Sequence, residues 1–204
     1  MSLTRSQRKL ADAFWSHWKT LLEAGAADRD TLEAAMDEGD RLLGEYDQAL
    51  GVEIYVDDAG QPALLLTAYG NSDRLQSVDD LVGSQPRLPG LPVLALRPPG
   101  NPDFELEIEE QLFSSARVWF DVLQDEEDPA FLGLEIYFPR ETLASDDSLF
   151  MVATLMVQML IGERAFMERI DLLRLGDRSM DPEDFEPLAS LSRLIGPAGS
   201  QARH

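Results

Sequence analysis

The sequence contains no cysteine, which excludes disulfide bonds, thiolate nucleophiles and cysteine-based metal sites. Histidine is nearly absent too: His17 and His204 are the only two, and neither has the neighbours of a zinc site or a catalytic triad. Basic residues are scarce, because 17 Lys and Arg stand against 38 Asp and Glu, for a formal net charge of −21. A surface of this sign repels phosphate groups, so we expect neither nucleic acid nor a membrane as a partner.

Long hydrophobic runs are also missing. The longest apolar-rich segment, residues 149–161, is shorter than the roughly 20 residues that a membrane span needs. The positive charges near the N-terminus are not followed by the apolar core of a signal peptide. We therefore expect a cytoplasmic protein. The densest acidic run lacks the alternating ligands and central glycine of a calcium loop, so we assign no metal, no cofactor and no catalytic residue.

The pattern of apolar residues predicts an α+β fold. Residues 1–50 contain two stretches of helical spacing and predict an N-terminal helical hairpin. Residues 51–97 predict strand, strand, helix and strand, and residues 104–195 repeat this order before a C-terminal helix. We expect these two β-β-α-β units to form a largely antiparallel sheet with helices packed on it, in one compact domain. Residues 196–204 are predicted to be a flexible tail.

The joint between the second strand and the first helix of the repeat has the sequence Gly70-Asn71-Ser72-Asp73. A glycine turn that opens a helix is able to hold a phosphate group. Here, however, a single glycine is present, Asp73 occupies the positive helix end, and Arg74 is the only nearby cation. We interpret Gly70 as the residue that permits the turn, and Asn71 or Ser72 as the helix cap.

The segment LLLTAYGNSDRLQSVDDLVGSQPRLPGLPVLALRP resembles a stretch of a group of uncharacterised bacterial proteins. The shared frame is an apolar strand, a glycine, a helix ending in LV, a proline-containing turn and a strand ending in RP. The later segment FLGLEIYFP and the apolar helix after it are similar to the continuation of that group, so the resemblance covers residues 50–175. It implies a bacterial cytoplasmic protein of unknown function and transfers no catalytic residue.

The segment 149–161 predicts a helix that is apolar nearly all round, with Thr154 and Gln158 as its only polar residues. Such a helix must be covered on most sides, either by its own chain as a central core helix or by a second subunit. For the second alternative we expect a homodimer, since two-fold pairing is the commonest assembly. The candidate interface residues are the three methionines of the segment: Met151, Met156 and Met159.

The first functional hypothesis is a non-enzymatic interaction or regulatory module with an acidic surface for a basic protein partner, such as a toxin or nuclease. Residues 98–150 hold 14 Asp and Glu but only two Arg, a concentration of charge that suits electrostatic steering. Their densest run, residues 125–128, lies at the predicted tip of a hairpin, and the alternative interpretation of this acidic hairpin is a solvated turn without a partner. The candidate contact residues belong to this acidic hairpin: Asp121, Asp125, Glu126, Glu127 and Asp128.

The second hypothesis is a small-molecule binding module with its pocket between the sheet and the N-terminal helices. Its candidate lining residues are aromatic: Trp15, Trp18, Tyr55 and Tyr69. An enzyme that uses carboxylates ranks third, because the abundant acidic residues form no recognisable catalytic cluster.

Overall fold

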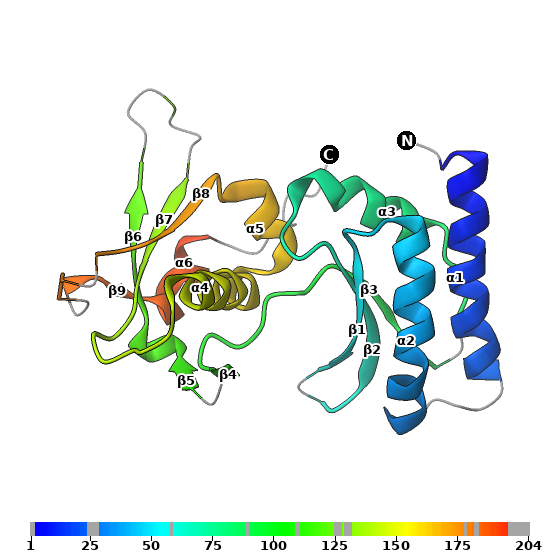
Figure 1. The fold of residues 1–204 in the computed structure, drawn as a ribbon, viewed down its shortest axis with the longest axis horizontal. Coiled ribbons are helices and arrows are strands. Elements are labelled where there is room, and N and C mark those ends of the chain that lie inside the picture. Colours follow the sequence, from blue (N-terminus) through cyan, green and yellow to red (C-terminus); the bar gives the residue numbers. More distant parts are fainter. Residues whose placement is uncertain are drawn as a thin grey trace. The chain divides into compact units, whose positions relative to one another are not determined.

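The computed structural model describes most of the chain: residues 3–23, 29–57, 59–88, 90–108, 111–124, 128, 132–177, 179–181 and 184–195. The chain divides into two compact units, Met1–Arg97 and Pro98–His204. We call them the N-terminal unit and the C-terminal unit; each contains helices and a sheet of its own (Figure 1). The α+β class predicted from the sequence is confirmed.

The N-terminal unit begins with a helical hairpin and continues with one β-β-α-β unit. Its elements are α1 (Arg5–Glu23), α2 (Arg29–Tyr46), β1 (Gly51–Val56), β2 (Pro62–Thr67), η1 (Ser72–Arg74), α3 (Leu75–Gly83) and β3 (Val93–Ala95). The sheet order is β1-β2-β3, with β1 antiparallel and β3 parallel to β2. The predicted order of strand, strand, helix and strand is confirmed.

Large aromatic side chains of α1 fill the core of this unit. Phe14, Trp15 and Trp18 are at most 2% exposed. The indole Nε1 of Trp15 donates hydrogen bonds to the carbonyl of Leu81 (3.1 Å) and to Ser84 Oγ (3.2 Å). These bonds connect α1 to the end of α3 and satisfy a buried donor whose isolation would be costly.

The joint after β2 has the structure that its sequence predicts. Gly70 has φ of 78°, a value that glycine adopts without the steric penalty of a side chain. Asn71 caps the following turn, because its side-chain oxygen accepts a hydrogen bond from Asp73 N at 3.1 Å. The joint is therefore held by its own backbone and cap.

The C-terminal unit contains the second β-β-α-β unit and several additional elements. They are β4 (Glu105–Ile108), β5 (Gln111–Ser114), η2 (Ser115–Arg117), β6 (Trp119–Leu123), β7 (Gly133–Tyr137), α4 (Asp146–Ile161), α5 (Glu163–Arg169), β8 (Leu172–Leu175), β9 (Glu186–Pro187), η4 (Leu188–Ser190) and α6 (Leu191–Leu194). The main sheet has the order β8-β7-β6-β9, and β4 pairs with β5 separately. As in the first repeat, the hairpin is antiparallel, and the strand after the helix pairs in parallel with its second strand.

The sequence predicts one sheet shared by both repeats, and the structure differs in this detail. In the described residues every strand pairs within its own unit. The end of the first repeat explains where pairing stops. Leu96 has φ of 70°, outside the extended region. Pro98 and Pro99 follow and have no N–H to donate to a ladder. A strand therefore cannot continue from β3 into the second repeat.

The end of the second repeat contains more than the predicted C-terminal helix. In the structure Glu186 pairs with Phe120 in the short strand β9, and the helix α6 begins only at Leu191. Phe185 stacks on Tyr137, with ring centroids 3.8 Å apart and an interplanar angle of 7°. Tertiary packing of this aromatic side chain and pairing with β6 override the local helical pattern.

The helix α4 forms the core of the C-terminal unit, and Figure 1 shows it nearly end-on. Ser145 caps it by accepting a hydrogen bond from Ser148 N at 3.2 Å, as the run of polar residues before it predicts. The helix ends at Gly162, where φ is 82°. Among the described helices, none alone has the length and apolar character of a membrane span. Joined, α4 and α5 meet those criteria but are bent by 107°.

Candidate functional site

The acidic hairpin predicted as a partner-binding site lies between β6 and β7. Asp121, on β6, and Asp128 are both exposed. The carboxylate of Asp121 accepts a hydrogen bond from Val122 N at 2.8 Å. Asp125, Glu126 and Glu127 lie outside the described residues. Partner binding by these side chains therefore stays a prediction.

Neutralising the tip of this hairpin should not destabilise the protein. Exposed like charges repel one another over about 10 Å at 0.1 M salt, so removing them relieves repulsion. We expect the Asp125→Asn, Glu126→Gln, Glu127→Gln and Asp128→Asn variant to melt at an unchanged or higher temperature. A fall of more than roughly 5 °C in a calorimetric scan, on the order of 1 kcal/mol or more, would show that the run binds a metal or a basic neighbour.

The four aromatic residues predicted to line a pocket occupy different environments. Trp15 and Trp18 pack against Phe14, with ring centroids 4.8 and 6.4 Å from its ring, inside the core. Tyr55 is partly buried on β1, whereas Tyr69 follows β2 and is 62% exposed. The indoles act as core side chains because they fill the space that the helical hairpin would otherwise leave open. None of the four lines a cavity described below.

The three methionines predicted at a subunit interface also differ in their exposure to solvent. Met151 is 51% exposed, Met159 is partly buried, and Met156 is fully buried in the core of its own unit. An interface role for Met156 is therefore wrong, since α4 turns that side toward its own sheet. Phe150, 46% exposed, joins Met151 on the outward side of the helix.

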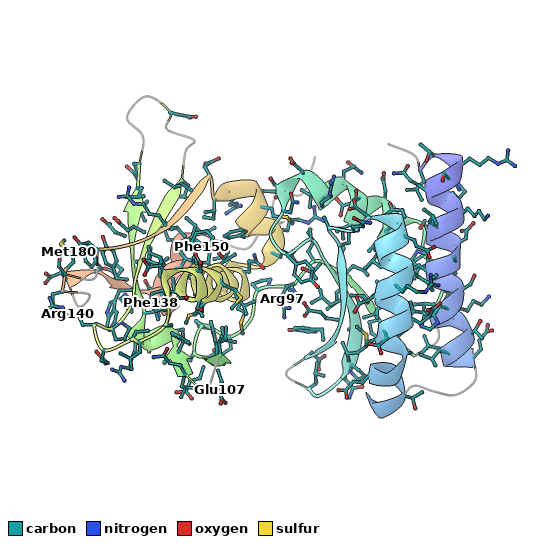
Figure 2. All side chains as sticks on the ribbon, viewed as in Figure 1. Arg97, Glu107, Phe138, Arg140, Phe150 and Met180 are labelled. Atoms are coloured by element: carbon teal, nitrogen blue, oxygen red, sulfur yellow. The ribbon has the colours of Figure 1, made fainter. Side chains whose placement is uncertain are left out.

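A further acidic surface, not singled out in the sequence, lies on the β4–β5 hairpin. Glu105 and Glu107 are both exposed, and neither forms a hydrogen bond or ion pair with another described residue. Figure 2 shows Glu107 projecting outward from β4. The pairing places Leu112 opposite Glu107 and Ser114 opposite Glu105. Leu112 is 59% exposed, so an apolar side chain lies among carboxylates that have no partner within the described chain.

The other face of this hairpin anchors it. Leu106, Ile108 and Phe113 contact the core of the C-terminal unit. The strict alternation in FELEIEE is the sequence signal that separates these inward side chains from the two outward glutamates. We name the outward set the β4–β5 acidic face: Glu105, Glu107, Leu112 and Ser114.

A cavity of about 360 Å³ lies in the C-terminal unit. It is bordered by the ends of the parallel strands β7 and β8, the segments that follow them and the first turns of α4. We call it the β7–β8 cavity. Its lining residues are Ile136, Tyr137, Phe138, Pro139, Thr142, Asp146, Leu149, Leu175, Gly176, Asp177 and Met180.

Backbone and side-chain contacts hold the two strand ends of this cavity in place. Gly176 N donates to the carbonyl of Ile136 at 2.8 Å and continues the ladder beyond β8. Arg140 donates to the carbonyls of Ser179 (3.1 Å) and Met180 (3.3 Å), and Figure 2 shows Arg140 and Met180 close together. The segment after β8 is thus tied to the segment after β7.

The hydroxyl of Tyr137 at this cavity donates to Glu135 Oε2 at 3.0 Å. Burial, together with this carboxylate, raises the pKa of Tyr137 to about 12 from 10.0. A raised pKa in the folded state gives stability that is complete below pH 10 and is lost as pH rises through 12.

We therefore expect an alkaline titration, followed by tyrosinate absorption, to contain a late step near pH 12 that Tyr137→Phe reduces. Tyr46, whose pKa is also raised to about 12 by burial, contributes to the same step. A late step of equal size in wild type and Tyr137→Phe would contradict the expectation.

Two more open hollows adjoin the β7–β8 cavity, and Pro139 borders all three. The ion pair of Arg117 Nη2 with Glu141 Oε1, at 2.9 Å, borders both hollows. Because both partners are about two-thirds exposed, this pair contributes little to stability. Within the described ranges, no group of three His, Asp or Glu residues is placed to hold a metal ion.

Comparison of the chain with models of protein families, with curated protein sequences and with solved structures finds no match.

Proposed function

We propose that the protein is a non-enzymatic, cytoplasmic interaction or regulatory module that binds a basic protein partner through its C-terminal unit. The observation that carries the proposal is the β4–β5 acidic face. There two exposed carboxylates, without partners in the described chain, flank the exposed Leu112. An apolar side chain among charges of one sign suits a contact with another protein. The charges attract the approaching partner, and the apolar side chain is buried when the partner binds.

The distribution of charge supports the same unit as the contact surface. Residues 98–204 hold 22 Asp and Glu against eight Arg, whereas residues 1–97 hold 16 acidic against nine basic residues. The acidic hairpin at Asp121 and Asp128 belongs to this unit as well and adds two exposed carboxylates to it. Exposed charges of one sign raise the association rate of an oppositely charged partner and repel nucleic acid.

Capture from a bacterial lysate with matched variants tests the proposal. We expect the immobilised wild type to retain a basic protein at about 50 mM salt and to release it at about 500 mM, where charge is screened within a few ångströms. The Glu105→Gln, Glu107→Gln variant should lose that protein. The control is Asp37→Asn, Asp40→Asn, which removes two exposed charges from α2 of the N-terminal unit and should retain it.

Retention of the same proteins by wild type and by the Glu105→Gln, Glu107→Gln variant would contradict the proposal. So would retention of duplex DNA or single-stranded RNA in preference to protein at low salt, since phosphate contacts are strongest there.

We also propose that the chain forms a homodimer through the outward side of α4. Phe150 and Met151 are 46% and 51% exposed, and large apolar side chains that share an exposed surface favour a protein contact. The substitutions that test this assembly are described in the Discussion.

A further inference from the structure

The β7–β8 cavity has the position and size of a ligand site. In sheets with parallel strands, ligands bind outside the carboxyl ends of the strands, where the connecting helices begin. The cavity lies at the carboxyl ends of the parallel pair β7 and β8 and is bordered by the first turns of α4. Its 360 Å³ falls within the roughly 300–1,000 Å³ that small-molecule sites occupy.

The charged side chains that line the cavity are both acidic. They are Asp146, in the first turn of α4, and Asp177, after β8; among the described residues the lining contains no Lys, Arg or His. Asp177 accepts a hydrogen bond from Ser179 N at 2.8 Å, and these contacts with Ser179 hold its pKa below the usual range. The carboxylate is therefore ionised at neutral pH and repels an anionic ligand.

Thr142 supplies an open hydrogen-bonding group. It lines the cavity and one neighbouring hollow, and its hydroxyl has no hydrogen-bond partner in the part of the chain that the structure describes. Although the residue is 8% exposed, its hydroxyl oxygen reaches solvent, so a ligand in the cavity is able to bind it. An N–H group of a cationic ligand would donate a hydrogen bond to this oxygen. The positive charge of the ligand would then lie near the two carboxylates.

The remaining lining is suited to an apolar body. Leu149, Leu175 and Met180 contribute aliphatic and thioether side chains, and Tyr137 and Phe138 also border the cavity. Apolar side chains of this kind cover a hydrocarbon chain. Figure 2 locates Phe138 and Met180 in the same part of the C-terminal unit.

We propose that the β7–β8 cavity binds an organic cation, an ammonium or guanidinium group carried on a short apolar chain. The inference does not depend on a basic protein partner at the β4–β5 acidic face, because no residue is shared between that face and the cavity lining.

The test uses the full chain labelled with ¹⁵N and four probes of one shape. n-Butylguanidinium and n-butylammonium should shift the amide signals of Thr142, Gly176 and Asp177 in a saturable way, at concentrations on the order of 1 mM for ligands of so few atoms. Neutral n-butanol and anionic n-butyrate should leave those signals in place. Absence of shifts with both cations, or equal shifts with butyrate, would overturn the proposal.

Matched variants locate the binding. Asp177→Asn keeps an oxygen for Ser179 N but removes the charge, and should lower the affinity for the cations by about tenfold. Thr142→Val keeps the shape of the side chain and should lower that affinity severalfold. Asp147→Asn neutralises an exposed carboxylate of the same helix turn outside the lining and should have a much smaller effect. If Asp177→Asn and Thr142→Val bind as wild type does, the proposal is wrong.

A further arm identifies the source of the cation. The peptide acetyl-Gly-Arg-Gly-amide presents the same group as a protein side chain. If it shifts the same amides as strongly as n-butylguanidinium does, the cavity accepts a side chain of a protein; if only the free cation binds, the ligand is a small molecule. Both results support a cation site.

Discussion

The Met156→Glu variant is expected to lose the folded C-terminal unit. Met156 is fully buried in α4, in a core that includes Val152 and Leu160. A carboxylate at this position has no cation to pair with in that core, and burying it costs several kcal/mol. That is comparable to the total stability of a domain, about 5–15 kcal/mol. We expect the indole signal of Trp119, on β6, to lose its native position in ¹H–¹⁵N spectra.

Met151→Glu is the matched control, because it places the same charge on the same helix at a residue that is 51% exposed. The variant should fold. If the chain is a homodimer, Met151→Glu should convert it to a folded monomer of 22.7 kDa in sedimentation equilibrium. A wild type that is monomeric at all micromolar concentrations would contradict the dimer, and a folded Met156→Glu would contradict the core position of that side chain.

Gly176→Ala should destabilise the C-terminal unit by about 2–3 kcal/mol, which lowers its melting temperature by roughly 10–20 °C. A Cβ at this position would overlap the ring of Tyr137. That ring cannot move aside freely, because it is 7% exposed, stacks on Phe185 and donates its hydroxyl to Glu135.

Gly51→Ala is its control. A Cβ there would overlap the hydroxyl end of Tyr69, a side chain that is 62% exposed whereas Tyr137 is buried. Thermal unfolding of the two variants should therefore differ clearly, with little change for Gly51→Ala. Equal melting temperatures for the two variants would show that the packing of Tyr137 does not restrict its ring.

Local patterns in the sequence predict the order of most elements because their signals are local. Alternation places β1, β6 and β7, and a continuous apolar run places β2. The turn at Gly70 and Asn71 is capped as its residues predict, and Ser145 caps α4. Elements that depend on distant partners are not predicted. The strand β9 exists because Glu186 pairs with Phe120, and Phe185 stacks on Tyr137.

The candidate sites illustrate the same limit. Thr142 and Asp177 are 35 residues apart in the sequence and border one cavity only because β8 pairs in parallel with β7. Trp15 and Trp18 suggest a pocket by residue type, yet Trp15 bonds to the end of α3 and Trp18 packs against α2, so both are core side chains. By contrast, the outward positions of Glu105 and Glu107 follow from alternation along β4, a signal that is present in the sequence although the acidic run at 125–128 is denser.

The most direct test of the proposed function is the rate at which the captured basic partner associates with the chain, measured by surface plasmon resonance at increasing salt. The account predicts an association rate that falls at least about tenfold between roughly 50 and 500 mM salt, and a similar fall at low salt for Glu105→Gln, Glu107→Gln. Asp37→Asn, Asp40→Asn should associate nearly as fast as wild type. An association rate that is independent of salt and unchanged in the Glu105→Gln, Glu107→Gln variant would contradict an acidic binding surface on the C-terminal unit.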